Sequence, residues 1–449
     1  MTIFIGDVQD SYVEKLAREY QTLLDDDIEL YRFRVDEFRG GEYKLRILEN
    51  GEDLTRPGQP DYHPSNENPD SLKGKIMDSD VFLVIRGGYG DDWDSDKIFN
   101  LALQGSELLK GGNSEFLDGE KAKNLYLVMP HEPFTKQDHM FTDSHNDDKP
   151  IRGEAVTLRM NRKTLQASGY DRLFTIYPHD FRREGDIRHR ALKTDLTRPL
   201  TDWRKYDNTD LTTLDDWTNY AWAIDAVEPF VKHIKRYVPG LDVATSPDTS
   251  GNSFSTLIRR ALDIWETDGI TKHRSRAEPS KLHVVKGFDP EHIKGKVVGI
   301  FDDWILSGGT LINGIRSADE CGASEIHVFI VHAELATWNE GKEKKSALEE
   351  IKNIELKNAS EIHLHVMDTV RLDGAIETFQ GENRSLTIIP SCETVALSMY
   401  YAINRPRQKT VAESLMGGLD IQLDETEPIK LTELSSTSSE ESPQTTLGI

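Results

Sequence analysis

Two adjacent carboxylates, Asp302 and Asp303, are followed by small residues of the kind that hold phosphate groups. Residues 297–301 are apolar and predict a buried strand that ends at the two acids. A helix is predicted over residues 310–320, so a turn connects this strand to the helix. The backbone N–H groups of a glycine turn, nearby hydroxyls and the positive end of the helix would together bind a phosphate. The candidate phosphate ligands are Ser307, Gly308, Gly309 and Thr310.

The two acids indicate a second ligand beside the phosphate. A carboxylate repels a phosphate, so Asp302 and Asp303 are expected to hold ribose hydroxyls or Mg²⁺, which prefers oxygen ligands. An ordinary strand–turn–helix corner with an Asp cap would explain paired acids and glycines on their own. The complete order of apolar strand, paired acids, hydroxyl, two glycines and Thr310 favours the phosphate site.

The rest of the chain supplies strands and helices in an alternating order. Short Val-, Ile- and Leu-rich strands separated by helices are typical of parallel sheets covered on both faces. Such sheets bind ligands at the carboxyl ends of their strands, which is where the two acids lie. Strands are predicted at 2–5, 30–35, 43–48, 81–85, 125–129, 173–177, 241–244, 281–285, 297–301, 326–331 and 386–389, and helices at 13–24, 96–109, 151–167, 253–265, 310–320 and 391–403.

The loop resembles the ribose-phosphate loop of the phosphoribosyltransferase superfamily. Further segments between about residues 1 and 405 are similar, in the same order, to motifs of one branch, the ribose-phosphate pyrophosphokinases. The first, Phe38-Arg39-Gly40-Gly41-Glu42, is similar to a Phe-Ser-Asp-Gly-Glu turn that holds the adenine of ATP across a subunit interface in that family. The other segments are Met129–His139, Lys149–Ile151, Ile176–Asp180, Ser246–Asn252 and the basic run Lys272–Arg276.

This resemblance implies an α/β protein with two tandem phosphoribosyltransferase-type domains, each with a central, mainly parallel sheet flanked by helices. It implies transfer of pyrophosphate from ATP to ribose 5-phosphate, which yields phosphoribosyl pyrophosphate and AMP, in a homo-oligomer. The roles it implies are metal ligands at His179, Asp248, Asp302 and Asp303 for Mg²⁺, catalytic cations at Lys272, Arg274 and Arg276, and nucleotide contacts at Phe38, Glu42, Lys136 and Gln137. His131 and His139 have no such role and are expected not to bind metal.

Four segments are predicted along the chain. An N-terminal domain covers residues 1–181 with an inserted loop at 50–74, and a polar insertion covers 182–216. A C-terminal domain with the phosphate loop covers 217–405. The last segment, 411–449, carries eight acids and one lysine and has the low complexity of a disordered tail.

Composition limits the partners of this protein. The net charge of −24 opposes binding to nucleic acid, so a phosphate ligand must be attracted by local cations. No run approaches the roughly 20 apolar residues that a membrane span needs, and no signal peptide is evident at the first residues. Cys321 and Cys392 are the only cysteines, which excludes a disulfide framework and fits a cytoplasmic location.

Several positions depart from the family pattern, and they keep four functions open. Leu306 stands where the synthetases carry an acid, Gly40 replaces the Asp of the adenine turn, and Lys136 replaces an Arg. The alternatives to ribose 5-phosphate activation are pyrophosphate transfer to a larger ester such as ADP-ribose, a phosphoribosyltransferase that consumes phosphoribosyl pyrophosphate, and a non-catalytic regulatory paralogue. The retained Asp302, Asp303, Asp248 and His179 disfavour the non-catalytic alternative.

Overall fold

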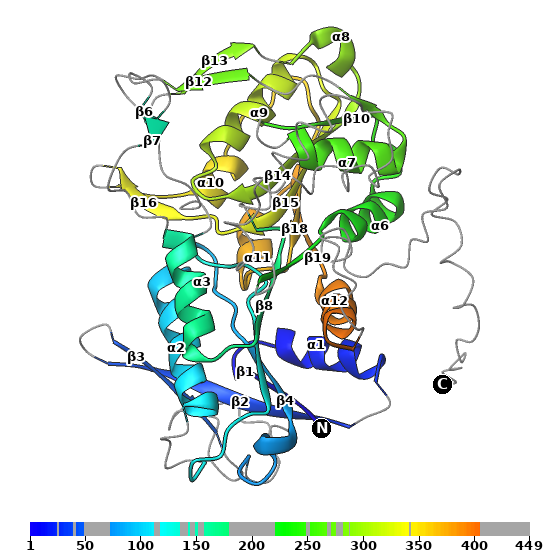
Figure 1. The fold of residues 1–449 in the computed structure, drawn as a ribbon. Helices are drawn as coiled ribbons and strands as arrows, with labels where there is room; N and C mark the ends of the chain where they lie inside the picture. Colours follow the sequence, from blue (N-terminus) through cyan, green and yellow to red (C-terminus); the bar gives the residue numbers. More distant parts are fainter. Residues whose placement is uncertain are drawn as a thin grey trace, which may run out of the picture.

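The computed structural model contains two separate β-sheets with helices on both faces of each (Figure 1). It describes residues 1–24, 27–38, 42–48, 72–111, 117–134, 142–143, 149–150, 157–178, 221–247, 252–266, 271–274, 282–286, 288–340 and 343–404. Two mainly parallel sheets, each covered by helices, confirm the predicted fold class.

The first sheet has seven strands in the order β3-β2-β1-β4-β5-β8-β9. Only the β2–β3 pair is antiparallel. The polar alternation of β2 and β3 fits their place at one edge of the sheet, and the continuous apolar runs of β1, β4 and β5 fit its centre. The strands are β1 (Thr2–Asp7), β2 (Ile28–Glu37), β3 (Tyr43–Ile47), β4 (Asp80–Val84), β5 (Asn124–Val128), β8 (Arg172–Ile176) and β9 (Ala221–Ile224).

The second sheet has six strands in the order β11-β10-β14-β15-β18-β19 and is parallel throughout. The parallel direction places all carboxyl ends at one edge and all amino ends at the other. The strands are β10 (Val243–Thr245), β11 (Trp265–Glu266), β14 (Val297–Ile305), β15 (Glu325–Ala333), β18 (Ile362–Met367) and β19 (Arg384–Ile389).

Three short hairpins lie outside the two sheets. They are β6 (Thr142–Asp143) with β7 (Lys149–Pro150), β12 (Thr271–Arg274) with β13 (Leu282–Lys286), and β16 (Thr337–Glu340) with β17 (Glu343–Ser346).

Alternating strand residues divide each sheet between two sets of helices. In the first sheet, Ile3 and Leu83 pack toward α2 (Ser95–Lys110) and α3 (Thr157–Ser168), whereas Phe4 and Phe82 pack toward α1 (Tyr12–Gln21) and α12 (Cys392–Asn404). In the second sheet one face packs on α9 (Gly309–Glu320) and α10 (Ala347–Lys352), and the other packs on α6 (Val227–Tyr237) and α7 (Asn252–Leu262). Two short helices, α8 (Pro290–Ile293) and α11 (Ala375–Phe379), also lie in the described part of the second half.

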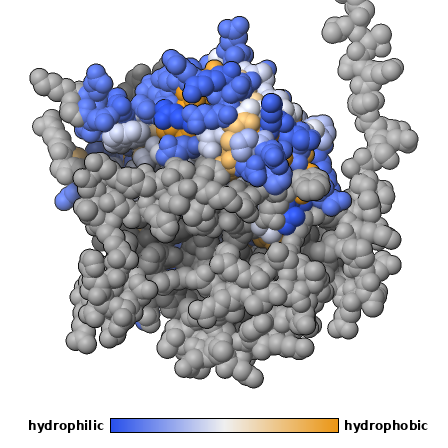
Figure 2. Space-filling view, turned by 90° about the horizontal axis from the view of Figure 1, so that it is seen from above, coloured by the Kyte–Doolittle hydropathy of each residue, from blue (hydrophilic) through white to orange (hydrophobic). Residues whose placement is uncertain are grey.

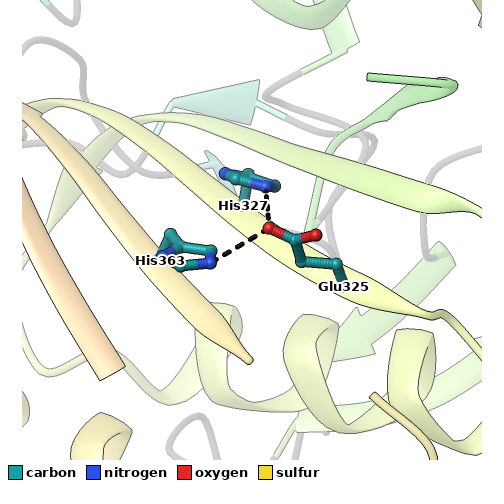
Figure 3. A group of neighbouring side chains, drawn as sticks. All are labelled: Glu325, His327 and His363. Carbon is teal, nitrogen blue, oxygen red and sulfur yellow. Dashed lines mark hydrogen bonds and ion pairs between the residues drawn. The ribbon is translucent and has the colours of Figure 1, made fainter. Parts of the chain in front are cut away.

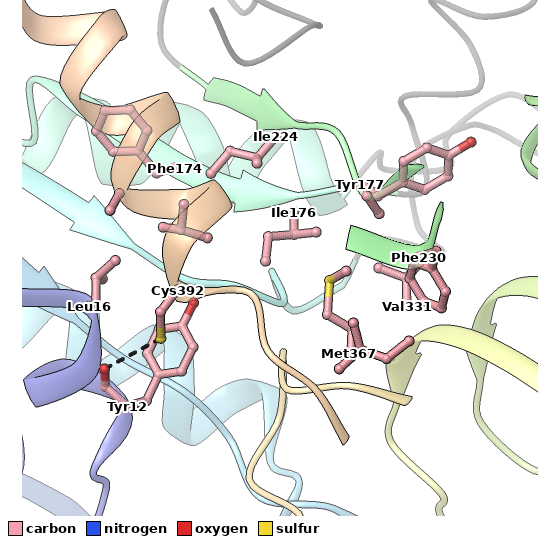
Figure 4. Packing of buried hydrophobic residues seen from close by; sticks show 14 of the residues in the cluster. Tyr12, Leu16, Phe174, Ile176, Tyr177, Ile224, Phe230, Val331, Met367 and Cys392 are labelled. Carbon is pink, nitrogen blue, oxygen red and sulfur yellow. Dashed lines mark hydrogen bonds between the residues drawn. The ribbon is translucent and has the colours of Figure 1, made fainter. Parts of the chain in front are cut away.

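One hydrophobic core continues from the first half of the molecule into the second. It joins Tyr12 of α1 and Ile224 of β9 to Val331 of β15 and Met367 of β18 (Figure 4). Because the residues of both halves share this core, we treat the two sheets as one packed unit rather than as independently moving domains.

The last helix of the described chain returns to the first half. Tyr400 of α12 lies edge-on to Tyr20 of α1, with ring centroids 6.5 Å apart, and Arg172 Nη1 of β8 donates a hydrogen bond to Ala402 O at 2.8 Å. At its start, Tyr12 Oη and Ser391 Oγ are hydrogen-bonded at 2.9 Å. The C-terminal helix therefore covers one face of the N-terminal sheet.

Strand pairing differs from the predicted boundary at residues 181 and 217. β9 follows the predicted insertion, yet it pairs with β8 and completes the first sheet. The helix α12 also packs on this sheet. The first structural half therefore contains two pieces, β9 and α12, of the sequence that was assigned to the C-terminal domain. Residues 50–71 of the predicted loop 50–74, the predicted insertion 182–216 and the predicted tail 411–449 lie outside the described residues.

The described surface is mostly hydrophilic in the view from above Figure 1, with hydrophobic residues in small separate areas (Figure 2). Among the described residues, the helices are too short or too polar to cross a lipid bilayer.

Candidate active site

The predicted phosphate loop lies between β14 and α9, at the carboxyl edge of the second sheet. Gly308 caps the helix in the left-handed conformation, with a φ of 74°, which a side chain would strain. Gly309 begins the helix, and a Cβ built on it would meet no atom within 4 Å. Ser307 and Gly309 are exposed, so the first turn of α9 is open to a ligand. The predicted turn and helix start are confirmed to within one residue.

Asp302 and Asp303 lie in the last part of β14, directly before this loop. Both are buried, with 7% and 4% of their surfaces exposed. The backbone N–H of Asp303 donates to Asp302 Oδ1 at 3.0 Å. Since successive side chains of a strand point to opposite faces, the two carboxylates have different surroundings and can be tested separately.

The chain after β10 approaches the same helix. Ser246 is fully buried, and a Cβ on Gly314 of α9 would lie 3.1 Å from Pro247 Cβ. A larger residue at 314 would therefore push this segment away from the helix. Asp248, the next residue, lies outside the described residues.

The carboxyl edges of the two sheets face each other. The loop after β4 hydrogen-bonds to the loops after β15 and β18: Gly90 N donates to Glu334 O at 2.6 Å, and Tyr89 N donates to Arg371 O at 3.1 Å. In return, Arg371 N donates to Gly87 O at 2.8 Å. The edges at which each sheet would bind ligands therefore border one shared region, as expected for a site between two domains.

A cluster of buried aromatic and charged side chains fills this border. His131, which follows β5, stacks on Trp93 at 4.6 Å and on His332 at 4.1 Å between ring centroids. Its Nε2 lies 2.7 Å from Glu334 Oε1. Trp304, which follows the two acids, lies edge-on to His131 at 5.7 Å. Trp304 thus packs against the first half of the molecule.

His332 connects this cluster to the acids. Its Nδ1 lies 3.1 Å from Thr369 Oγ1, and its Nε2 lies 3.3 Å from Tyr177 O. Burial, with a contribution from His131, holds the pKa of His332 well below its usual value, and the nearby Asp303 opposes this only in part. His332 is therefore neutral near pH 7.

Two buried ion pairs hold the N-terminal side of the border. Arg162 of α3 donates Nε to Glu132 Oε1 at 2.8 Å and Nη2 to Glu132 Oε2 at 2.6 Å. Arg86, after β4, donates Nε to Asp10 Oδ2 at 2.9 Å and Nη1 to Asp368 O at 2.6 Å. Such paired geometry fixes both side chains and ties the loop after β4 to the loop after β18.

The remaining predicted site residues are only partly described. Lys136, Gln137, His179, Asp248 and Arg276 lie outside the described residues. The described stretch that contains β8 ends at Pro178, immediately before His179. In this stretch, Tyr177 O contacts His332 of the cluster.

The other predicted site residues lie in the β12–β13 hairpin and beside the β2–β3 turn. Lys272 and Arg274 are backbone positions of β12, paired with Val284 and Leu282 of β13. Phe38 is 52% exposed, and its N–H donates to Glu42 O at 2.8 Å across the β2–β3 turn. This turn therefore presents Phe38 to solvent or to a partner.

Several residues of the cluster were not predicted. His332 and Glu334 directly follow a predicted strand, the position that drew attention to Asp302 and Asp303, so their place at a strand end was a usable signal. Trp93 and Arg162 lie in a loop and a helix, and only the packing of the two halves brings them to the site.

Comparisons with known proteins find distant relatives of this chain. No protein-family model matches the chain. It is 24% identical over 276 residues to a ribose-phosphate pyrophosphokinase of Methanobrevibacter smithii, covering 60% of this chain and 75% of the relative. It is 29% identical over 121 residues to ribose-phosphate pyrophosphokinase A of Dictyostelium discoideum, covering 27% of this chain and 37% of the relative.

A solved structure has the same architecture. The crystal structure of phosphoribosylpyrophosphate synthetase from Mycobacterium smegmatis aligns with a TM-score of 0.56 and 16% identity, covering 89% of this chain and 97% of that one. In sequence this chain is similar, at low identity, to ribose-phosphate pyrophosphokinases, and it shares its fold with a phosphoribosylpyrophosphate synthetase.

Proposed function

We propose that this protein is a ribose-phosphate diphosphokinase, which transfers pyrophosphate from ATP to ribose 5-phosphate and releases AMP. A hydroxyl oxygen of the sugar bonds to the β-phosphorus of ATP, the bond from that phosphorus to the α-phosphate oxygen breaks, and AMP leaves with the electron pair. The observation that carries the proposal is the phosphate loop, Ser307–Thr310, at the border between the two carboxyl edges.

The loop and the acids have separate roles in this reaction. The exposed turn at Ser307 and Gly309 would bind the 5-phosphate, and Thr310 would add a hydroxyl donor. Asp302 and Asp303 would hold ribose hydroxyls or Mg²⁺. Carboxylate oxygens are the ligands that a hard divalent cation such as Mg²⁺ prefers. Bound Mg²⁺ would neutralise phosphate charge; Asp248 and His179 are further proposed ligands.

ATP would be bound by residues from several elements. Lys136 and Gln137 are proposed to contact its phosphates, and Lys272, Arg274 and Arg276 to neutralise charge in the transition state. Phe38, exposed beside Glu42 on the β2–β3 turn, suits a contact with the adenine in a neighbouring subunit, so we propose a homo-oligomer. Cys321 and Cys392 are free thiols, which fits the proposed cytoplasmic location.

A product analysis tests this function. Purified protein is incubated with ATP, Mg²⁺ and one candidate ribose phosphate at a time, and the nucleotides are identified by mass. AMP and phosphoribosyl pyrophosphate that form only with ribose 5-phosphate support the proposal. Pyrophosphate release that requires phosphoribosyl pyrophosphate and a free base would instead indicate a phosphoribosyltransferase, and no turnover with any sugar would indicate a regulatory paralogue.

One observation favours a larger acceptor as the second candidate. Leu306, at the start of the loop, is 36% exposed and apolar where an acid is expected. It cannot accept a hydrogen bond from a sugar hydroxyl, and one such missing bond lowers specificity by about ten- to a hundredfold. We would compare kcat/KM for ribose 5-phosphate and ADP-ribose in wild type and Leu306→Asp. An Asp that lowers only the use of ADP-ribose supports the larger acceptor, and an unchanged ratio removes that support.

A further inference from the structure

A second group of potential ligands lies at the opposite edge of the second sheet from the phosphate loop. Glu325 and His327 belong to β15, and His363 occupies the position of β18 that pairs with His327 (Figure 3). Glu325 stands at the amino end of β15, eight residues before Ala333 at its carboxyl end, so a rise of about 3.3 Å per residue separates the group from the loop by roughly 26 Å. No step of the transfer reaction uses these residues.

The distances within the group suit a metal ion. Glu325 Oε1 lies 2.8 Å from His327 Nε2 and 3.0 Å from His363 Nε2, and all three ligand atoms lie within 4.8 Å of one another. Around a tetrahedral zinc ion with bonds of about 2.1 Å, neighbouring ligand atoms lie about 3.4 Å apart. A small outward movement of the three side chains would therefore admit the ion. Glu361 Oε2 lies 3.1 Å from His363 Nε2 but does not belong to the group of mutually close ligand atoms, so a water molecule would complete the tetrahedral shell.

The Nδ1 atoms of both histidine rings make hydrogen bonds, as the second ring nitrogen of a metal-binding histidine usually does. His363 Nδ1 lies 2.6 Å from Ser385 Oγ, and His327 Nδ1 lies 2.9 Å from His365 Nε2. His365 Nδ1 in turn lies 2.9 Å from His233 Nε2 on α6. These contacts leave both Nε2 atoms directed at the carboxylate of Glu325.

We propose that Glu325, His327 and His363 bind one Zn²⁺ ion, with water as the fourth ligand, and that this ion joins β15 to β18 at the amino edge of the second sheet. Imidazole and carboxylate together favour zinc over Mg²⁺ or Ca²⁺, which prefer oxygen ligands alone. The side chains of Glu325 and His363 are 34% and 18% exposed, so the ion can enter from solvent. This site is independent of the proposed transfer reaction.

Metal titration of chelator-stripped, full-length protein tests the proposal. Zn²⁺ is titrated into the protein, and the heat of binding is measured by isothermal titration calorimetry. Excess Mg²⁺ is present throughout, so that sites that prefer Mg²⁺ stay filled. We expect wild type to bind one equivalent more than His363→Gln or Glu325→Gln, and its Tm to rise by about 2–4 °C at 100 times the Kd. His292→Gln, which alters an exposed histidine on α8, should bind like wild type. Ser385→Ala should weaken binding about tenfold.

Equal stoichiometry in wild type, His363→Gln and Glu325→Gln would overturn the proposal and leave an ordinary hydrogen-bonded cluster. If those variants do not fold, the wild type alone decides. The Zn K-edge absorption spectrum of the one-equivalent complex should show two imidazoles with carboxylate oxygen. A spectrum with fewer than two imidazoles, or with thiolate, would equally overturn it.

Discussion

The imidazole of His131 and the carboxylate of Glu334 meet at 2.7 Å, although one follows a strand of the first sheet and the other a strand of the second. Both side chains are almost fully buried. The pair therefore fixes the relative position of the two carboxyl edges between which we place the reaction. This contact gives the first prediction.

Glu334→Gln should destabilise the protein, because an amide keeps the shape but loses the charge that holds His131. Hydrogen bonds to charged groups contribute about 1.5–3 kcal/mol each, so we expect a loss in this range in the free energy of unfolding. Urea unfolding of the full chain measures it. Glu382→Gln, at an exposed position, is the control and should change stability by less than about 0.5 kcal/mol. Equal stabilities would show that the pair contributes nothing.

Asp302→Asn and Asp303→Asn, made separately, should each lower kcat by about 100-fold or more, because the substitutions remove charge aimed at the ligand. Both variants should also need more Mg²⁺ for half-maximal rate. Asp289→Asn is the matched control, since an Asn can still cap α8 as Asp289 does. Full turnover in either variant would assign that acid a purely structural role.

Asp319 gives a prediction for pH dependence. Burial opposes its ionisation, but backbone N–H groups of Ala359, Lys357 and Asn358 outweigh burial and hold the pKa of Asp319 below its usual value. A lowered folded-state pKa gives stability that is present above the unfolded pKa of about 3.9 and lost as pH falls through the folded one.

Asp319→Asn should therefore cost about 2–3 kcal/mol at pH 7, because the amide loses the negative charge and its NH₂ group cannot accept from the Lys357 N–H, although Oδ1 can still accept from Asn358 and Ala359. The difference from wild type should shrink below about pH 4, where the wild-type carboxyl also becomes neutral. Unfolding free energies measured between pH 3 and 7 check this. A difference that stays constant across the range would contradict the assigned role of the charge.

The two thiols should react at different rates. Burial, with Asp368 second, holds the pKa of Cys392 far above its usual value, and burial raises that of Cys321 less. Since the thiolate is the nucleophile, Cys321 should be alkylated first by iodoacetamide at pH 8, and Cys392 only after unfolding. Mass spectrometry of timed digests distinguishes the two sites. Early labelling of Cys392 would mean that α12 detaches from α1 in the native protein.

Much of the fold was predictable because apolar runs alone mark buried parallel strands. β1, β4, β5, β14 and β15 were predicted within a few residues, and so were α2 and α9. The phosphate loop was predictable for a related reason: strand, turn and helix are contiguous in sequence. What composition could not indicate was any contact made only after the two halves pack, such as that of His131 with Glu334.

β18 shows where the sequence signal failed. Its residues Ile362–Met367 alternate apolar residues with His363 and His365, and this pattern resembles an exposed strand rather than the centre of a sheet. The strand was not predicted, and β15 was predicted to begin one residue after Glu325. The proposed zinc ligands come together only through the β15–β18 pairing, so neither strand alone could reveal them.

The return of α12 to α1 sets an order on biosynthesis. The ribosome releases the chain from its N-terminus, yet the helix that covers one face of the first sheet begins only at Cys392. Until α12 is synthesised, aromatic residues of that sheet and of α1 stay exposed, and exposed apolar surface favours aggregation. A fragment that ends at residue 181 would stay in this condition permanently, whereas supplying the α12 segment as a separate peptide would provide the missing surface.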